Sequence, residues 1–399
     1  MWRPELRFDL VEEHFDELDF LCEQREANLA TPDWTLQDLG EHEARMEAHL
    51  DGLRVAGETG RELARERLVG DEPSASAAAA LVLLSSGSGE PVDAAFECFR
   101  GDAPEAVEGL RRALRMLGIA GHVDRLRALA ASEDEAVSAA ACDVLAFHRE
   151  GDFPCARLLG SASEDVRRIG LGALGRTGRI TAEELAAALA EPSPLVRRAA
   201  LEAAARAGLS ECRAHCLSAA TRRTDPDPEC VRFLGVLGGD GAGADLVEAL
   251  DRPEVAADAV AALGALGSVE HVPLLLDLME HDDLGPDAVE AYRRITGADD
   301  VEGHLPVPRE PVGEEEDERD VLPPDPEKAR ADWERREGAL TPNACWQEGL
   351  RIDAGELPPA FDSLSLRARR DVFLRARSSN AAGVDDLELE APAARQVRV

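Results

Sequence analysis

A short apolar stripe at helical spacing recurs along this chain, and its clearest copy is residues 192–208, PSPLVRRAALEAAARAG. Two prolines punctuate the chain at the start of this copy, Ser193 offers a capping oxygen, and Gly208 closes it. The spacing predicts a helix over residues 195–207. The expected buried face consists of Leu195, Val196, Ala199, Ala200, Ala203 and Ala204. A helix this short is marginal alone, so it needs neighbours of the same kind.

Diverged copies of this pattern are marked by a valine soon after a turn. The marker valines are Val107, Val137, Val166, Val196, Val231, Val255 and Val289. Their separations of 30, 29, 30, 35, 24 and 34 residues indicate a period near 30, which has room for two helices. In the copy above, the first helix is expected over residues 182–189 after Thr181, and the turn over residues 191–194. The pattern predicts an all-α superhelical solenoid of about seven helix pairs over residues 59–297.

Residues 1–58 differ from the repeats and predict an N-terminal helical cap. Asp9 and Thr35 are the expected capping residues of two helices, the second with Asp38 three positions on. The predicted apolar faces are Val11, Phe15, Leu18 and Cys22 in the first helix and Leu39, Met46, Leu50 and Leu53 in the second. A solenoid needs such an end because its core would otherwise be exposed.

Residues 298–326 break the pattern and predict a Pro-rich acidic linker. Six prolines surround a run of five carboxylates at residues 314–318. Proline removes backbone donors and like charges extend the chain, so a solvated spacer is expected. An acidic mimic that docks on a basic partner is the alternative role for this run.

Residues 327–399 recover the signals of ordered structure and predict a C-terminal helical extension. Its apolar positions are Trp333, Trp346, Ile352, Leu357 and Phe361. A basic amphipathic helix is expected over residues 363–377, and it carries Arg367, Arg369, Arg370, Arg375 and Arg377. Pairing with acidic residues of the same chain is one role for this helix, and docking on another protein is the other. For the docking role, the residues expected to bind the partner are Arg367, Arg370 and Arg375.

The net charge of the chain limits the kinds of molecule that it is expected to bind. The 399 residues carry 80 acidic and 44 basic side chains, a formal net charge of −36, and Lys328 is the one lysine. Such a field repels phosphate backbones unless a basic face is segregated, so no nucleic-acid partner is expected. Aromatic residues make up 4% of the chain, so small side chains must fill the core, which favours closely packed helices. The acidic bias also fits adaptation to salt or genome composition.

The sequence also bears on the compartment. The amino terminus, MWRPELRFDL, lacks the apolar core of a signal peptide. The longest apolar run, residues 77–84, is far shorter than the ~20 residues that span a bilayer. We therefore expect a cytoplasmic protein with no membrane partner. The eight cysteines are scattered along the chain, unlike those of small secreted disulfide scaffolds, so we expect them to be reduced.

Four residues carry ligand types that hold zinc, namely Cys212, His215, Cys216 and Cys230. Their C-x-x-H-C spacing differs from the commoner C-x-x-C pairs, although Cys212 and Cys216 would share a helix face. Buried cysteine is also a common small core residue. We predict no metal, no cofactor and no catalytic residue, and whether these four residues hold a metal stays open.

The repeat segments SEDVRRIG and PSPLVRRAA resemble HEAT repeats of the short bacterial type. The resemblance implies a right-handed superhelix of antiparallel helix pairs, with the second helices on the concave side. It also implies that Arg167, Arg197 and Arg232 pair with acidic turn residues of neighbouring repeats. Contact with a partner is the alternative role for these three arginines.

Enzymes built on HEAT-like repeats have sequence features that this chain lacks. Some of them bind iron through His-Glu pairs at equivalent repeat positions. Here Glu41-His42-Glu43 lies outside the array, and the pairs Glu270-His271 and Glu280-His281 fall in one repeat. HEAT-like DNA glycosylases need a cationic groove with aromatic residues, which the composition does not supply. We therefore expect that the protein is not an enzyme.

Residues 36–58, LQDLGEHEARMEAHLDGLRVAGE, form the most specific stretch of the chain. Together with residues 12–34 and with APAARQ at residues 391–396, they resemble a proteobacterial family of HEAT-like proteins. Some members of that family are encoded near type VI secretion genes. The resemblance implies a role in assembly or cargo loading, and it transfers no catalytic residues.

These observations favour a non-catalytic protein-binding scaffold or adaptor. On the resemblance, its protein partner would be an effector or spike component of a contractile, type VI-like secretion system. Two alternatives stay open. One is a metal-dependent or lyase-like enzyme on the same repeats, and the other is a structural protein that self-assembles into a homo-oligomer.

Overall fold

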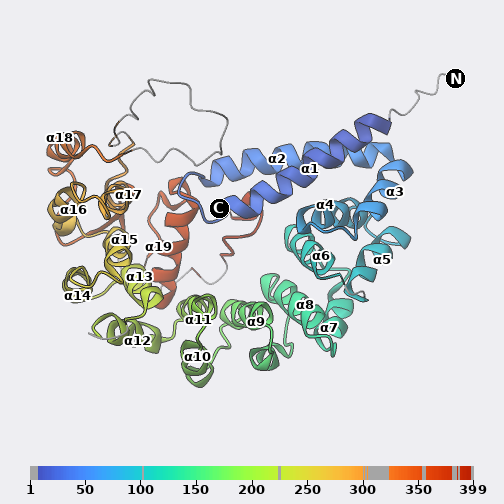
Figure 1. Ribbon diagram of the computed structural model, residues 1–399. Helices are drawn as coiled ribbons and strands as arrows, with labels where there is room; N and C mark the ends of the chain where they lie inside the picture. Colours follow the sequence, from blue (N-terminus) through green and yellow to red (C-terminus); the bar gives the residue numbers. More distant parts are fainter. Residues whose placement is uncertain are drawn as a thin grey trace. The chain divides into compact units, whose positions relative to one another are not determined.

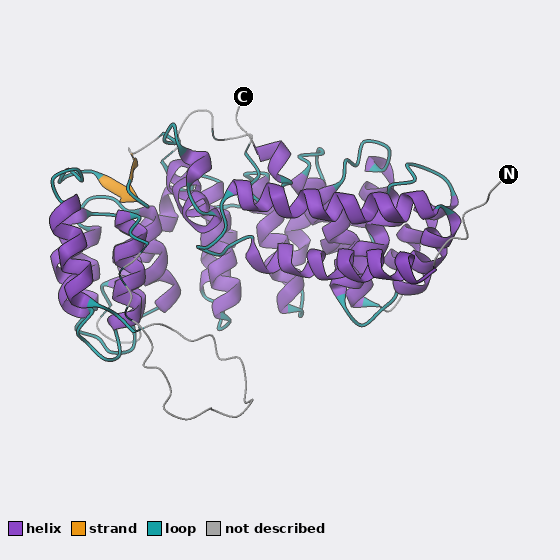
Figure 2. Cartoon of the chain, turned by 90° about the horizontal axis from the view of Figure 1, so that it is seen from above, coloured by secondary structure: helices purple, strands orange, loops and turns teal. Residues whose placement is uncertain are grey.

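The structure of the protein is a computed structural model that describes residues 8–100, 103–222, 226–299, 301, 303, 323–352, 356–379, 384 and 387–396. Helices dominate these residues, and the strands among them form one short hairpin (Figure 2). The prediction of an all-α solenoid of helical repeats is therefore confirmed. No helix in this part of the chain has the length and the apolar character required to cross a membrane.

The chain divides into two compact units, which are described separately. Unit 1 comprises the described residues of Met1–Ala207, Ser365–Arg367 and Asp386–Val399, and unit 2 those of Gly208–Leu364 and Ala368–Asp385. The division falls inside the predicted array of residues 59–297, and the C-terminal part of the chain contributes to both units.

Unit 1 consists of two long helices followed by a series of short ones. Its elements are α1 (Phe8–Asn28), α2 (Leu36–Ala56), α3 (Glu58–Arg67), α4 (Pro73–Leu84), α5 (Glu90–Glu97), η1 (Cys98–Arg100), α6 (Pro104–Met116), α7 (Val123–Ala130), α8 (Glu135–Phe147), η2 (Cys155–Gly160), α9 (Glu164–Arg176), α10 (Ala182–Leu189), α11 (Pro194–Arg206) and α20 (Ala393–Gln396). The long helices α1 and α2 lie side by side and both pack on α4 (Figure 1). The predicted apolar faces of both long helices are buried.

The capping signals of the two long helices have different outcomes. Thr35 and Asp38 form the expected capping box, in which the Asp38 carboxylate accepts a bond of 2.8 Å from the Thr35 amide. The Thr35 hydroxyl in turn accepts from the Asp38 amide. The prediction for Asp9 is wrong, because this residue lies inside the first turn of α1 and does not precede the helix.

The second helices of successive pairs form a continuous inner row in unit 1. Helices α4, α6, α8, α9 and α11 contact one another in that order, whereas α5, α7 and α10 lie outside this row (Figure 1). The marker valines of this unit are buried near the start of the row helices, at Val107, Val137, Val166 and Val196. In one pair the first element is the 3-10 helix η2 and not an α-helix.

The repeat with the clearest sequence pattern has the predicted helices but a shifted buried face. Helix α10 has the expected bounds, and α11 begins after Ser193, whose hydroxyl accepts from the Val196 amide at 3.3 Å. The prediction for Leu195 is wrong, since this residue is 50% exposed. Helix α11 packs against both α9 and α10, so its buried arc turns toward Ala200 and Leu201 and leaves Leu195 outside.

Unit 2 continues the array and adds the extension. Its elements are α12 (Ser210–Ala220), α13 (Pro228–Leu237), α14 (Ala242–Ala249), α15 (Ala256–Leu266), η3 (Val269–His271), α16 (Val272–Leu278), α17 (Gly285–Thr296), α18 (Pro326–Arg336), β1 (Cys345–Gln347), β2 (Leu350–Ile352), η4 (Phe361–Ser363) and α19 (Leu366–Ser378), whose first two residues belong to unit 1. Helices α13, α15 and α17 form the row of second helices, and their marker valines are buried at Val231, Val255 and Val289.

Small residues set the spacing between second helices in both units. A Cβ atom added at Gly175 of α9 would lie 2.5 Å from the Ala203 Cα atom of α11. A Cβ atom added at Gly264 of α15 would lie 2.7 Å from the Ala291 Cα atom of α17. Both distances are too short for a carbon contact, so glycine is required where these backbones meet.

The extension of residues 327–399 contains a hairpin that its sequence did not suggest. Strands β1 and β2 pair antiparallel, with Trp346 opposite Arg351. The Trp346 amide donates to the Gly267 carbonyl at 2.8 Å, and the Glu348 amide donates to the Arg294 carbonyl at 2.7 Å. The hairpin therefore covers the carboxyl ends of α15 and α17, where helix carbonyls lack intrahelical donors.

The predicted linker of residues 298–326 is described at its ends. Its acidic run at residues 314–318 lies outside the described residues. The Gly303 amide donates to the Pro323 carbonyl at 2.7 Å. The two described ends of the linker therefore lie next to each other in unit 2.

Candidate functional site

Arginine recurs at the carboxyl ends of the inner-row helices in unit 1. Arg176 is the last residue of α9, Arg206 is the last residue of α11, and Phe147 ends α8 between Arg115 and Arg176 in sequence. Arg115 lies in the last turn of α6. The guanidinium carbons of Arg115 and Arg176 lie 4.7 and 5.8 Å from the centre of the Phe147 ring. Cations at these positions also interact favourably with the helix dipoles.

Asp143 of α8 interacts with two arginines of this series, Arg115 and Arg176. Its side chain is 3% exposed and accepts from Arg176 at 2.8 Å, and it also pairs with Arg111. An Arg115 nitrogen lies 3.7 Å from the same carboxylate. Burial alone would raise the pKa of Asp143, but the charges of the arginines outweigh burial and hold that pKa well below its usual range. We call Asp143, Arg115, Arg176 and Arg206 the arginine cluster.

Residues 387–396, which we call the C-terminal segment, bring two more carboxylates to the arginine cluster. Glu388 accepts from Arg176 at 3.1 Å and lies 3.4 Å from Arg206. Glu390 accepts from Arg176 at 2.9 Å and also pairs with Arg115. Three arginines thus exceed Asp143 by two formal charges, and the two glutamates of the segment balance that excess.

The charges in this site perturb one another strongly. Burial alone would raise the pKa of Glu388, but the charges of Arg206, Arg176 and Arg115 outweigh it and lower that pKa. Burial and the neighbouring charges of Arg176 and Arg111 together lower the pKa of Arg115 to about 10, against the opposing effect of Asp143. Asp143 and Glu388 are therefore ionised at neutral pH.

The cap helices also hold the C-terminal segment. Arg25 of α1 donates to the Glu390 carbonyl oxygen at 2.9 Å and to the Glu43 carboxylate at 2.8 Å. Glu43 of α2 accepts from the Ala393 amide at 2.7 Å. These bonds fix the backbone of the segment, whereas the arginine cluster binds its acidic side chains.

The end of the segment is anchored by packing and by one more arginine. Ala393 packs in a small apolar cluster with Leu36, Leu39 and Leu366. Arg395 donates to the carbonyl oxygens of Arg115 and Met116 at 2.8 Å each. Residues 36–43 of α2 and residues 390–393 of the C-terminal segment therefore meet in space.

A cavity of about 210 Å³ lies beside Glu390 at the arginine cluster. Arg111 and Arg168 line it together with the arginines of the cluster. The Nε atom of Arg115 is buried and has no hydrogen-bond partner among the described residues. A space lined by five arginines with a buried donor nearby is suited to anionic groups.

The arginines predicted to bind a partner are placed differently. Arg375 is 8% exposed, and its guanidinium donates to four backbone carbonyls at 2.7 to 3.2 Å. These carbonyls end α13 and α15 and belong to Gly235, Val236, Ala265 and Leu266. Burial lowers the pKa of Arg375. The ends of two helices use its donors, which counts against a role for Arg375 in binding a partner, and that role stays a prediction.

Among the other arginines of α19, Arg369 is buried and the rest are half-buried. Arg369 is buried and its guanidinium lies 4.8 Å from the centre of the Phe361 ring. Arg367 and Arg370 are half-buried, and their role in binding a partner stays a prediction.

The predicted arginine ladder of the repeats is partly confirmed. Arg167 pairs at 3.0 Å with Glu191 in the turn of the next repeat, as expected. Arg232 pairs with Asp258, which lies in the next second helix and not in a turn. Arg197 donates to backbone carbonyls of its own turn, including that of Glu191 at 3.0 Å, and its pairing with an acidic residue of a neighbouring repeat stays a prediction. These contacts stabilise the array from within.

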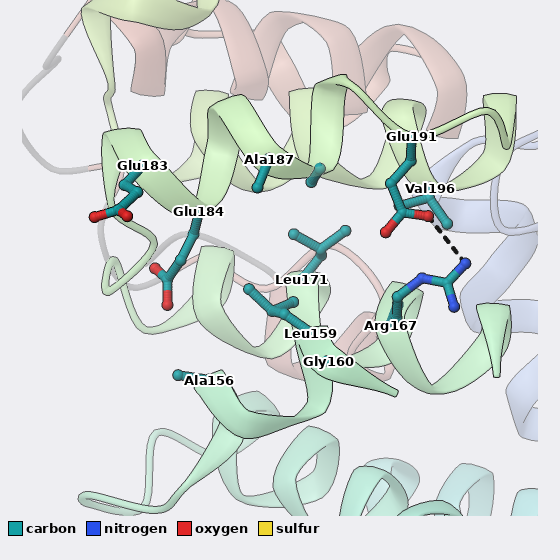
Figure 3. Close-up of a pocket in the computed structure, with 11 residues that line it drawn as sticks. Ala156, Leu159, Gly160, Arg167, Leu171, Glu183, Glu184, Ala187, Glu191 and Val196 are labelled. Carbon is teal, nitrogen blue, oxygen red and sulfur yellow. Dashed lines mark ion pairs between the residues drawn. The ribbon is translucent and has the colours of Figure 1, made fainter. Parts of the chain in front are cut away.

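A second hollow, of about 350 Å³, lies where η2, α9, α10 and α11 meet (Figure 3). Its polar groups are Glu183, Glu184, Glu191 and Arg167. Figure 3 shows the ion pair between Arg167 and Glu191 at its edge. Glu184 is the carboxylate of the capping box at the start of α10. These groups serve the packing of the repeats, so the arginine cluster is the stronger candidate for function.

Three of the four candidate zinc ligands are cysteines whose thiols lie together in the core, and the fourth is a histidine. Cys212, Cys216 and Cys230 are fully buried, and His215 is half-exposed. Contacts of the Cys216 thiol with those of Cys212 and Cys230, together with burial, raise the pKa of Cys216 well above its ordinary value. Across the part of the chain that the structure describes, no group of three or more His, Cys, Asp or Glu side chains is arranged to hold a metal ion. All eight cysteines, each of them described, have free thiols.

Residues of the His-Glu pairs that could bind iron make other contacts in the structure. The buried His42 ring bonds to the Leu21 carbonyl at 2.8 Å and packs against Trp34, and Glu43 binds the C-terminal segment. His271 is half-buried beside a cavity of about 640 Å³ in unit 2. These pairs do not converge on one site within a unit.

The sequence contained a signal for part of this site. Arg176 and Arg206 each lie ten residues after a marker valine, and Phe147 has the same position in the preceding repeat. The paired arginines beside the valines have a register that is equally regular, so this signal does not stand out in the sequence. Glu388 and Glu390 have no local signal, since their role depends on a contact with helices about 180 to 270 residues earlier in the chain.

Comparison with known proteins adds no function. No protein-family model matches the chain, and no curated protein matches it. One similar solved structure is a crystal structure of an engineered protein from the Northeast Structural Genomics Consortium, with 19% sequence identity over 71% of this chain and 89% of that chain and a TM-score of 0.32. A TM-score this low carries no argument, so any functional conclusion rests on the site itself.

Proposed function

We propose that this protein is a non-catalytic scaffold or adaptor that binds a protein partner. The observation that carries the proposal is the arginine cluster of unit 1, which holds an extended acidic stretch of polypeptide through its side chains and its backbone. Stacked helical repeats present extended surfaces of this kind in many binding proteins. The contacts with the C-terminal segment support the proposal, because an acidic stretch of a partner can form the same ion pairs and backbone bonds.

The candidate site favours binding over catalysis. The pKa values of Asp143 and Glu388 are lowered and that of Arg115 is about 10, which keeps these three groups charged and unsuited to proton transfer at neutral pH. The resemblance of residues 36–58 and 391–396 to HEAT-like proteins near type VI secretion genes supports a more specific role. In that role the partner is an effector or spike component that the protein loads onto a contractile secretion system.

Affinity capture from the cells that make this protein tests the proposal. The full chain is the bait, and the matched control is a full chain with Arg176→Gln and Arg206→Gln, which weakens the cluster at two positions. We expect a stoichiometric partner protein with the first bait and at least about tenfold less of it with the second.

Two results would contradict the proposal. One is equal recovery of every co-purified protein with both baits, since the cluster would then contribute nothing to binding. The other is turnover of a small molecule by the purified chain, or stoichiometric zinc that is lost with Cys212→Ser or Cys216→Ser, which would favour the alternative of an enzyme on the same repeats.

A further inference from the structure

We infer that the arginine cluster is the docking site for an extended acidic peptide of the partner, with two carboxylates two residues apart, and that the C-terminal segment occupies this site until the peptide displaces it. The inference rests on the proposed function and adds to it the chemistry of the ligand and its competition with the chain itself.

The spacing of the carboxylates follows from how the segment is bound. Glu388 and Glu390 both reach Arg176 and Arg206, and the residue between them, Leu389, is buried. Residues 387 and 388 are neither helical nor paired in a sheet, and Leu389 and Glu390 lie in a turn. The geometry therefore selects Glu-x-Glu with an apolar middle residue, a pattern that a partner's segment can supply.

The electrostatics favour an acidic ligand over an apolar or basic one. Without the segment, Arg115, Arg176 and Arg206 would exceed Asp143 by two charges in a half-enclosed site. Burying such an excess is costly, so an anion must neutralise it, and two carboxylates at one time do so with bonds to guanidinium groups. The cavity beside Glu390 leaves room for a ligand larger than the segment.

The segment is built to leave without unfolding the unit. Its regular structure is the single short helix α20, of four residues. Its buried apolar residues are Leu389, Ala391 and Ala393, and Ala393 lies in the cluster with Leu36 and Leu39. A short terminal segment with one turn of helix and few buried apolar side chains exchanges more readily than a packed helix of the row.

Competition within one chain has a measurable consequence. A site that is occupied by its own segment binds an added peptide with an affinity reduced by the fraction of molecules whose site is open. Opening the site by a substitution in the segment therefore raises the apparent affinity for an added peptide and leaves the arginines in place.

Fluorescence anisotropy with the labelled peptide LELEAPAARQ, the sequence of residues 387–396, tests the inference on full-length protein. The opened variant is Ala393→Glu, which puts a carboxylate against Leu36 and Glu43 and leaves the cluster unchanged. We expect the peptide to bind this variant about tenfold or more tightly than the wild-type chain. The control peptide LQLQAPAARQ should bind the variant about tenfold more weakly than the acidic peptide.

A second opened variant protects the test against misfolding. If Ala393→Glu loses its helical circular dichroism, the full chain with Glu388→Gln and Glu390→Gln is used, because it weakens the segment without a new charge. Adding Arg206→Gln to either opened variant should lower peptide binding again by about tenfold.

Each contrary result is informative. Equal peptide affinity for wild-type and opened chains overturns the competition, and equal affinity for the Glu and Gln peptides overturns the acidic ligand. Doubling of the mass of an opened variant in light scattering would show instead that copies exchange segments, in favour of self-assembly. A partner captured by wild-type and Arg-to-Gln baits alike would count against the proposed function, whereas a partner captured in the absence of any peptide binding would overturn this inference alone.

Discussion

In both units, arginine side chains lie at the carboxyl ends of second helices. Their hydrogen-bond acceptors differ between the two units. In unit 1, Arg176 and Arg206 bind carboxylates of the C-terminal segment, which are side chains that can leave and be replaced. In unit 2, Arg375 of α19 binds backbone carbonyls at the ends of α13 and α15. The acceptors of Arg375 are part of the fold and cannot leave without it.

The difference teaches how to separate binding arginines from structural ones in a repeat protein. Exposure alone does not do it, because Arg176 and Arg375 are both almost fully buried. The chemical nature of the hydrogen-bond acceptor separates the two kinds of arginine. A guanidinium held by helix carbonyls acts as a cap for those helices, whereas one held by carboxylates of a short terminal segment is an anion site with a replaceable ligand.

Replacing Arg375 should have the largest effect on stability. In Arg375→Leu the four carbonyls at the ends of α13 and α15 lose their donors inside the protein, which should cost about 3 kcal/mol or more. Urea unfolding of the full chain measures the loss, and amide hydrogen exchange in α13 and α15 assigns it to unit 2. Arg370→Leu on the same helix is the control, with an expected cost below about 1 kcal/mol. Equal costs for the two variants would contradict the capping role.

Replacing Asp143 should have a smaller but still large effect on unit 1. Asp143→Asn leaves the neighbouring guanidiniums without their shared charge, at an expected cost of about 2 kcal/mol or more. Hydrogen exchange in α8 and α9 should show this loss, with α13 and α15 unchanged. A neutral effect would mean that the C-terminal carboxylates alone balance the cluster.

Acid should affect the C-terminal segment before it affects the Arg375 site. The folded-state pKa values of Glu388 and Asp143 are lowered, so these groups stabilise the fold fully above the unfolded-state pKa of about 4, and this stabilisation is lost as pH falls toward the folded-state values. Hydrogen exchange between pH 5 and pH 2.5, corrected for the intrinsic pH dependence of exchange, should show progressive opening of residues 389–396 below about pH 4. The same loss in Glu388→Gln as in the wild-type chain would contradict this origin.

The smallest expected effect is at the surface of α11. Leu195→Ala should change the free energy of unfolding by less than about 0.5 kcal/mol, because Leu195 is half-exposed. Leu201→Ala, in the same helix and fully buried, should cost about 2 to 4 kcal/mol. Chemical denaturation of the two variants checks the shifted buried face, and a reversed order of the costs would show that the apolar pattern alone was the better guide.

The local sequence pattern predicts much of the fold and little of the candidate site. Prolines, capping residues and apolar spacing predicted the bounds of α10, the start of α2 and the burial of every marker valine, because these depend on contacts within about one repeat. Leu195 was assigned to the core because periodicity does not say which neighbours a helix has. The hairpin of β1 and β2 was missed because its pairing serves the ends of α15 and α17 and not a local signal.

The candidate site depends on contacts across the whole length of unit 1. Arg176 and Arg206 could have been noticed from their equal distance to marker valines, but Arg168 and Arg198 look just as regular. Glu388 and Glu390 read as two more charges in a chain that is acidic throughout. Their role follows from tertiary placement alone, as does the assignment of Arg375 to a buried capping site.

Hydrogen exchange of the wild-type chain with and without excess unlabelled LELEAPAARQ peptide tests the central comparison most directly. The account predicts that the peptide accelerates exchange of amides in residues 389–396 and leaves those at the carboxyl ends of α13 and α15 unchanged. Exchange of residues 389–396 as slow as that of α13 and α15, and unaffected by the peptide, would show that the C-terminal segment is a fixed part of the fold like Arg375.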